Sequence, residues 1–163
     1  MSEALVVWLK ATPVSEAMRT SQFIWPICET LHFIGLALLI GGAGLIDLRL
    51  MGFLKSVSVS AVMQVRKWAA LGIAINVITG VLFFVGAPDQ YIENPAWYGK
   101  LLFLAVAIVN VVIFETTQGD RMLRLPPGEK TPISFKLAGA VSMGSWLLVL
   151  YFGRMLPFLG NAF

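Results

Sequence analysis

The sequence predicts an all-α fold, an integral membrane four-helix bundle with a short interfacial N-terminal helix. Of the 163 residues, 58% are hydrophobic and only 13% are charged. The charges gather in a few places and leave four long apolar segments, and about 20 apolar helical residues are enough to cross the core of a bilayer. We therefore treat residues 1–163 as a single four-span membrane domain, with spans at about 21–47, 66–86, 96–116 and 134–159.

The segment before the first span, residues 1–20, mixes apolar and polar residues around Trp8 and Pro13. This pattern is typical of one or two short helices that lie in the membrane interface. The chain starts with the acidic Glu3 close to Met1, where a cleavable signal peptide carries basic residues. We therefore expect the first span itself to enter the membrane.

The four spans are predicted from the segments that contain few or no charged residues. Residues 23–46 contain one charge, Glu29, and residues 68–85 and 97–114 contain none. The fourth segment, 135–159, has Lys136 at its start and Arg154 near its end. Such stretches are long enough to cross the membrane as helices.

Basic residues are concentrated in the first and third loops, and positively charged short loops stay on the cytoplasmic side. The residues are Arg49, Lys55, Arg66, Lys67, Arg121, Arg124 and Lys130. We expect a multi-pass protein of the plasma membrane, here a bacterial inner membrane, with both termini outside. The net charge of +3 is explained by these loops, so the expected partners are the lipid bilayer and other membrane subunits or a second copy, with no nucleic acid.

The first span carries the main candidate site. His32 is the only histidine of the chain, and Glu29 precedes it by one helical turn. Ionisable residues at membrane depth are functional candidates by default. Counted from the same side of the membrane, Arg154 lies at a depth similar to that of Glu29, which predicts an ion pair, and Asn76 lies level with His32.

Two interpretations of this polar interior remain open. In one, Glu29, His32, Asn76 and Arg154 form a hydrogen-bonded network that holds together a non-catalytic accessory or assembly subunit. In the other, His32 is an axial ligand of haem b, which makes it a metal ligand. A small metal or cation transporter is a third alternative.

The haem interpretation assigns further residues. Gly35 would leave space for the face of the porphyrin, and Arg154 or Lys100 would meet the propionates. Asn76 would orient the imidazole. Transmembrane haem b usually has two axial histidines, so the second ligand would be Met143, another residue or a partner subunit, or there would be none.

Other chemistry finds little support in the residues. Asp47 and Glu115 lie at the inner ends of spans, where we expect solvated or locally paired charges. The chain has no phosphate-binding glycine loop and no nucleophile with an adjacent base. We assign no catalytic residue and expect no catalytic activity from the protein by itself.

Two stretches, one in the first span and one at its inner end, carry a resemblance: Glu29-Thr30-Leu31-His32-Phe33-Ile34-Gly35 and Asp47-Leu48-Arg49-Leu50-Met51-Gly52. The chain resembles an uncharacterised family of small bacterial four-helix membrane proteins. More loosely, it is similar to the copper-resistance D proteins and the J-type protoporphyrinogen oxidases. The oxidase resemblance implies a haem-associated histidine at His32, and the copper resemblance implies metal import. The expected function is that of a b-type haem-binding or redox-complex membrane subunit in electron transfer.

Overall fold

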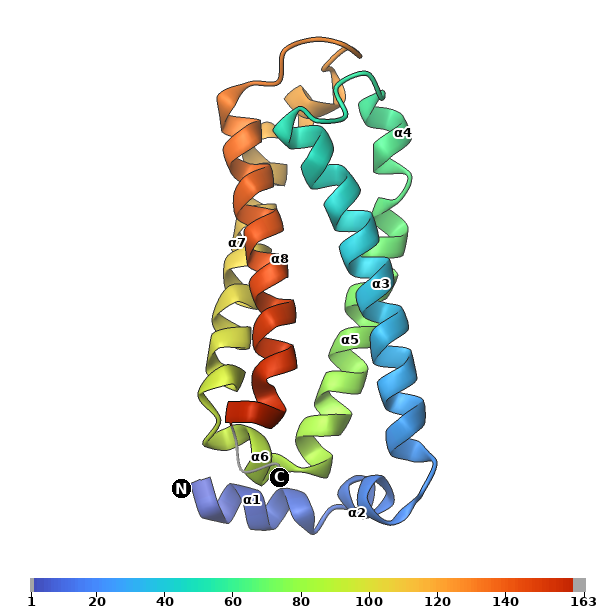
Figure 1. Ribbon diagram of the computed structural model, residues 1–163, viewed down its shortest axis with the longest axis vertical. Helices are drawn as coiled ribbons and strands as arrows, with labels where there is room; N and C mark the ends of the chain where they lie inside the picture. The colour runs from blue at the N-terminus through green and yellow to red at the C-terminus, as the bar shows by residue number, and fades with distance from the viewer. Residues whose placement is uncertain (1, 160–163) are drawn as a thin grey trace.

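The computed structural model describes residues 2–159, which form eight helices and no strand. Four long helices run the length of an elongated bundle (Figure 1): α3 (Ile24–Met51), α5 (Arg66–Gly86), α7 (Pro95–Leu123) and α8 (Ile133–Leu159). Each is long and apolar enough to cross a membrane. The predicted all-α four-span bundle is therefore confirmed. Helices α3 and α7 continue past the predicted ends of their spans, at residues 47 and 116.

The packing order of the long helices is simple. Helix α3 packs along α5 and also against α8, and α8 packs along α7. Small residues allow the closest approaches: a Cβ atom at Gly42 of α3 would lie 2.9 Å from the Cβ of Ala69 on α5. At the contact with α8, a Cβ atom at Gly139 would lie 2.9 Å from the carbonyl oxygen of Asp47. Glycine lets membrane helices approach in this way.

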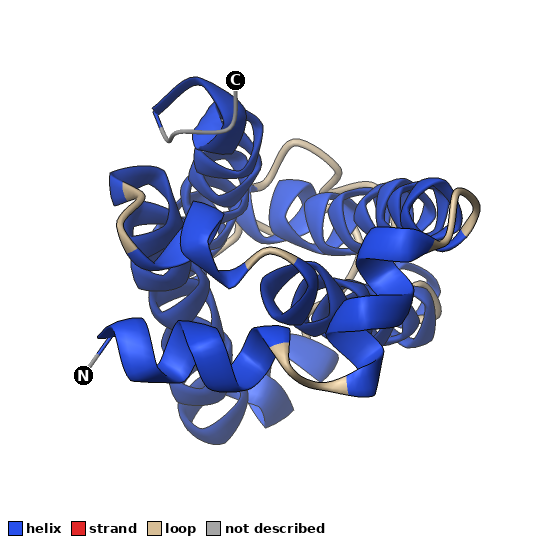
Figure 2. Cartoon of the chain, turned by 90° about the horizontal axis from the view of Figure 1, so that it is seen from below, coloured by secondary structure: helices blue, strands red, loops and turns tan. Residues whose placement is uncertain are grey.

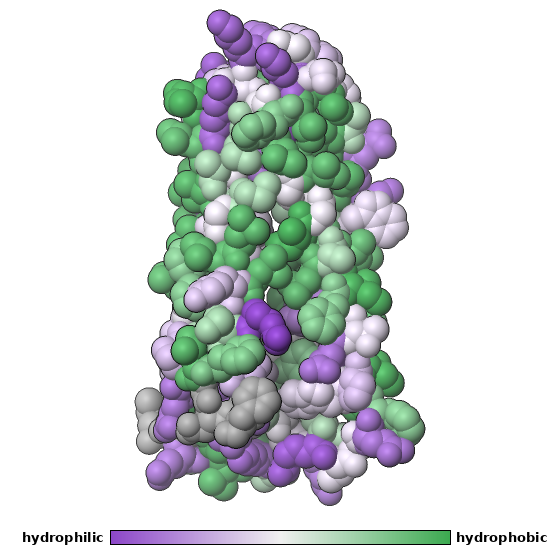
Figure 3. Space-filling model, viewed as in Figure 1, coloured by the Kyte–Doolittle hydropathy of each residue, from purple (hydrophilic) through white to green (hydrophobic). Residues whose placement is uncertain are grey.

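The sides of the bundle are apolar. Many large hydrophobic residues are exposed along all four long helices, and Figure 3 shows hydrophobic side chains over the middle of one face with hydrophilic ones gathered toward both ends. In a bilayer these side chains meet lipid instead of water. The distribution supports a multi-pass membrane protein.

Short helices close one end of the bundle, which we call the terminal end. Helices α1 (Ser2–Lys10) and α2 (Pro13–Thr20) lie across this end, next to α6 (Pro88–Ile92) (Figures 1 and 2). The Lys10 amino group lies 3.1 Å from the Asp89 carboxylate, which ties α1 to α6. Residues 2–20 thus form two short helices across the bundle end, in agreement with an interfacial segment.

The opposite end, which we call the loop end, holds the helix α4 (Val59–Met63) and the connection between α7 and α8. Helix α3 stops there at Gly52, whose φ of 92° is the left-handed conformation that glycine adopts freely. Because α3 begins and α8 ends at the terminal end, an even number of spans places both chain ends on one side of the membrane. The charge distribution predicts that this side is the outside.

Candidate functional site

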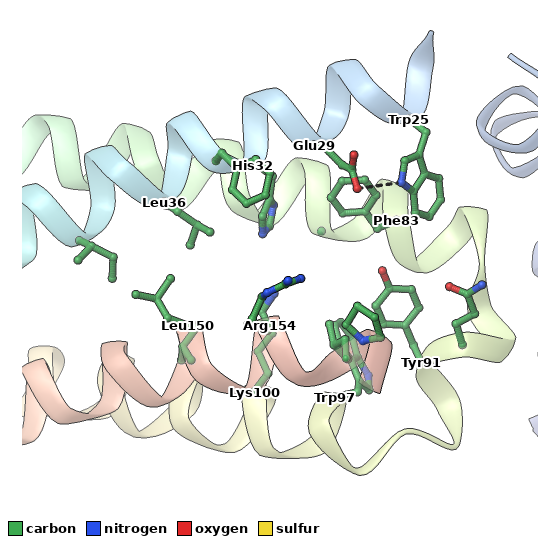
Figure 4. Close-up of a pocket in the computed structure, with 18 of the residues that line it drawn as sticks. Trp25, Glu29, His32, Leu36, Phe83, Tyr91, Trp97, Lys100, Leu150 and Arg154 are labelled. Atoms are coloured by element: carbon green, nitrogen blue, oxygen red, sulfur yellow. Dashed lines mark hydrogen bonds between the residues drawn. The ribbon is translucent and has the colours of Figure 1, made fainter. Parts of the chain in front are cut away.

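A pocket of about 650 Å³ lies in the half of the bundle nearer the terminal end. Its charged side chains and its histidine come from three long helices: Glu29 and His32 from α3, Lys100 from α7 and Arg154 from α8. The close-up in Figure 4 shows them on facing sides of one space. Aromatic side chains form much of the wall nearest the terminal end, namely Trp25, Phe83, Tyr91 and Trp97.

The imidazole of His32 is held from the second spanning helix. Its Nδ1 atom lies 2.7 Å from Oγ1 of Thr79. The same hydroxyl lies 2.7 Å from the carbonyl oxygen of Ile75, to which it donates. A hydroxyl has one proton to give, so Thr79 accepts from the N–H at Nδ1. This assigns the tautomer of His32 and leaves Nε2 with its lone pair.

The packing and direction of the His32 ring determine which of its nitrogens faces the pocket. The ring packs edge-on against Phe83, with 5.6 Å between the ring centroids, and points from α3 across the pocket toward Arg154 (Figure 4). In the described part of the chain, the hydrogen bond of the imidazole is the one through Nδ1. Nε2 is therefore the ring atom left to face the pocket.

The two charges predicted to pair lie in the same pocket, each with an aromatic neighbour. The Glu29 carboxylate accepts from the indole Nε1 of Trp25 at 3.3 Å. The guanidinium of Arg154 lies 5.3 Å from the centroid of the Phe158 ring. The ion pairs recorded within residues 2–159 are two others, near the ends of the bundle. The Glu29–Arg154 pair stays a prediction.

Lys100 lies in the pocket beside Gly153 of α8. A Cβ atom at Gly153 would lie 3.7 Å from the Lys100 amino group, an ordinary van der Waals contact. The side chain of Lys100 therefore runs along this turn of α8.

Three predicted site residues, Gly35, Asn76 and Met143, are not among those that line the pocket. Gly35 faces α5, where a Cβ atom would lie 2.5 Å from Nδ2 of Asn76, so its small size serves helix packing and not the pocket. Asn76 donates to the carbonyl oxygen of Gly72 at 2.8 Å. Thr79, one turn further along α5, makes the contact with His32 that depth counting gave to Asn76.

Met143 also lies far from His32. Its Cε is 3.8 Å from the Cβ position of Gly44, which follows His32 by twelve residues in the same helix. At a rise of about 1.5 Å per residue this is about 18 Å along α3. Met143 therefore does not reach an iron bound at His32.

Of the two inner-end charges, Asp47 differs from expectation and Glu115 agrees with it. Asp47 is buried, with 4% of its surface exposed, so it does not face bulk water. Glu115 does have a local partner, Arg66, at 3.4 Å. The sequence argument placed Asp47 at an interface because the apolar run ends there, but α3 continues to Met51 and packs this turn against α8.

Sequence reasoning did not select Tyr91 of α6. Burial, and after it the charge of Glu29, raises the pKa of the Tyr91 phenol to about 12. The phenol therefore keeps its proton and remains a hydrogen-bond donor at the rim of the pocket. Its place near Pro88 and Asn94 in a turn gave no signal beyond that of an interfacial aromatic residue.

The fold and this pocket define a class: a four-span helical membrane protein with a cation-bearing pocket near one end. Within that class the chain belongs to a family of unknown function, DUF6644, whose model matches residues 18–159. Comparisons with curated proteins and with solved structures find no significant match. The expected membership of an uncharacterised family is confirmed, whereas none of these comparisons shows a relation to copper-resistance D proteins or J-type protoporphyrinogen oxidases.

Proposed function

We propose that this protein is a membrane subunit that binds haem b in the pocket near the terminal end, with Nε2 of His32 as the axial ligand. One observation carries the proposal. Nδ1 of His32 lies 2.7 Å from the hydroxyl of Thr79, and a metal-ligating histidine commonly donates from its second ring nitrogen to an oxygen, which fixes the tautomer and the ring direction.

The charges and the walls of the pocket support an anionic, largely apolar ligand. Two cations, Lys100 and Arg154, line the pocket together with one carboxylate, that of Glu29, which leaves one positive charge uncompensated. The two propionates of haem would take their place next to these cations. The volume of about 650 Å³ lies within the range of cofactor pockets.

The residues that line the pocket would offer haem iron one protein ligand, His32, instead of two. The pocket lining contains neither a second histidine nor a methionine. Haem supplies one-electron redox chemistry when bound. The residues of this chain would hold the iron, orient the imidazole through Thr79 and balance the propionates, and we expect the spectrum of a haem with a single strong protein ligand.

The test is an absorption spectrum of protein purified in mild detergent from haem-replete cells. We expect a Soret band in the wild type and its loss in His32→Gln. Thr79→Val should retain haem with a shifted band, because it removes only the partner of Nδ1. Thr116→Val is the matched control, since that hydroxyl bonds to carbonyls of its own helix. A wild type without a Soret band, or an unchanged band in His32→Gln, would overturn the proposal.

A second candidate is an accessory subunit in which the same residues are structural. The observation that favours it is that the His32–Thr79 hydrogen bond joins α3 directly to α5. Such bonds between membrane helices contribute about 0.6 kcal/mol on average. In this case the wild type carries no haem, and Thr79→Val and His32→Gln lower stability by similar small amounts. The described residues contain no cluster of three or more histidine, cysteine or acidic side chains that could hold a metal ion. The alternative of a metal transporter therefore has no observation in its favour.

A further inference from the structure

A second cavity, of about 200 Å³, lies between the four long helices in the half of the bundle nearer the loop end. Asp47 of α3, Asn110 of α7, and Ser142 and Trp146 of α8 are among its lining residues. Asp47 and Trp146 are each only 4% exposed. The cavity is thus a largely apolar space that contains a few buried polar side chains, inside the part of the protein that crosses the membrane.

Two of these side chains carry buried polar atoms without a partner. The Oδ2 atom of Asp47 and the Nε1 atom of Trp146 have no hydrogen bond within residues 2–159. The first accepts and the second donates. The Ser142 hydroxyl lies beside the Asp47 carboxyl but leaves Oδ2 unsatisfied. A buried polar atom without a partner is costly.

Water suits both kinds of atom. It can donate to an acceptor such as Oδ2 and accept from a donor such as the indole N–H, and each water takes up about 30 Å³ in the liquid. The volume of about 200 Å³ leaves room for several. A metal cation would satisfy Oδ2 but would be repelled by the N–H of Trp146, so the donor and acceptor together favour water.

Within residues 2–159, no basic side chain forms an ion pair with Asp47. The basic side chain that lines the cavity, Arg66 of α5, lies 3.4 Å from Glu115 of α7, and α8 contributes no charged residue to the lining. Arg49, two residues further along α3, donates instead to the carbonyl oxygen of Val57 at 2.8 Å. A buried carboxyl in this position is stable when it holds a proton.

This cavity is separate from the pocket around His32. A buried apolar cluster of Leu39, Ala107, Trp146 and Val149 lies between the two. Asp47 follows His32 by fifteen residues, which is about 22 Å along the helix. The two sites therefore do not share a ligand.

We propose that Asp47 is a proton-binding carboxyl in a hydrated cavity, and that it exchanges its proton with the aqueous phase at the loop end past the Arg66–Glu115 pair. The exchange is a simple transfer: a hydronium ion gives its proton to the carboxylate and becomes water, and the reverse step returns it. This inference does not depend on haem.

The test is infrared spectroscopy of the reconstituted protein over a range of pH, in H₂O and D₂O. We expect one protonated-carboxyl C=O band that shifts in D₂O and is lost in Asp47→Asn. Glu115→Gln is the control and should keep the band. Should Asp47→Asn not fold, Trp146→Phe should shift the band, because it removes the donor to the cavity water.

Two results would overturn the proposal. One is a folded wild type in which no carboxyl band responds to Asp47→Asn or to Trp146→Phe. The other is a band that disappears when sodium replaces choline at constant pH, because that result would identify a sodium site. Neither measurement needs a bound cofactor, so failure here and failure of the haem proposal are distinguishable.

Discussion

Gly35 of α3 and Gly72 of α5 face each other at the point of closest approach between the two helices. A Cβ atom at Gly72 would lie 2.6 Å from the carbonyl oxygen of Gly35, and one at Gly35 would lie 3.1 Å from the carbonyl oxygen of Gly72. The contact is between backbones, which cannot move aside as a side chain can. It lies one helical turn from His32 and so determines how far α5 stands from the imidazole.

Replacement of Gly72 by alanine should therefore destabilise the protein. The added methyl group meets backbone atoms of Gly35 and Leu39, both at 2.6 Å, and overpacking of this kind costs about 1–3 kcal/mol. Thermal unfolding in detergent measures the effect. Gly41→Ala is the control, because nothing lies within 4 Å of its Cβ position; equal melting temperatures for the two variants would contradict the close contact.

The orientation of the bundle is open to cysteine labelling. A cysteine at Glu93, near the terminal end, should react with a membrane-impermeant maleimide in intact cells, whereas cysteines at Ser56 and Glu129, near the loop end, should not. All three positions are exposed, and the native Cys28 is buried. Lysed cells, in which all three should react, provide the control. The reverse pattern in intact cells would place the termini inside.

Glu29 and Arg154 should be energetically coupled, because both charges line one pocket with apolar walls. Neutralising one charge leaves the other without compensation. The double variant Glu29→Gln, Arg154→Gln should therefore lose less unfolding free energy than the two single variants lose in sum. Coupling of contacting groups is about 0.5–3 kcal/mol. Arg121→Gln, near the loop end, should combine additively with Glu29→Gln, and additivity in both cycles would show that the predicted pair does not form.

Tyr91 should ionise only at a pH well above the ordinary range of a tyrosine. Burial and the charge of Glu29 raise its pKa to about 12, whereas a tyrosine in an unfolded chain ionises near about 10. The folded state holds the proton more tightly, so this contribution to stability is complete below about pH 10 and is lost as the pH rises through about 12.

Ultraviolet absorbance during alkaline titration measures this ionisation. Tyr91→Phe should remove the step at the highest pH. Glu29→Gln should move that step to lower pH, since the carboxylate is the second cause of the shift. A titration that is unchanged by Tyr91→Phe would contradict the assignment.

The helices could be predicted because each depends on nearby residues. The absence of charge between residues 68 and 85 is enough to predict a span, whatever lies next to it. The contact of His32 could not be found in this way, because depth counting gives the level of Asn76 and Thr79 on α5 but not the rotation of that helix about its axis. The rotation is set by the packing of Gly72 against Gly35 and Leu39.

The burial of Asp47 could not be predicted from the sequence either. Its sequence neighbourhood, with Arg49 two residues away, is that of an interfacial charge. Its burial depends on Gly139 of α8, where any side chain would meet the backbone of α3, and on the length of α3 beyond it. Both are properties of the assembled bundle, so no local pattern predicts them.

The apolar cluster of Leu39, Ala107, Trp146 and Val149 has an electrical consequence. With water in the cavity on one side of it, a membrane voltage falls mainly across the dry layer that remains. A full elementary charge that crosses the membrane gains about 2.3 kcal/mol for each 100 mV, but a proton that travels from the loop end to Asp47 stops before this layer. The protonation of Asp47 should therefore follow the acidity of the compartment at the loop end and respond only weakly to the voltage.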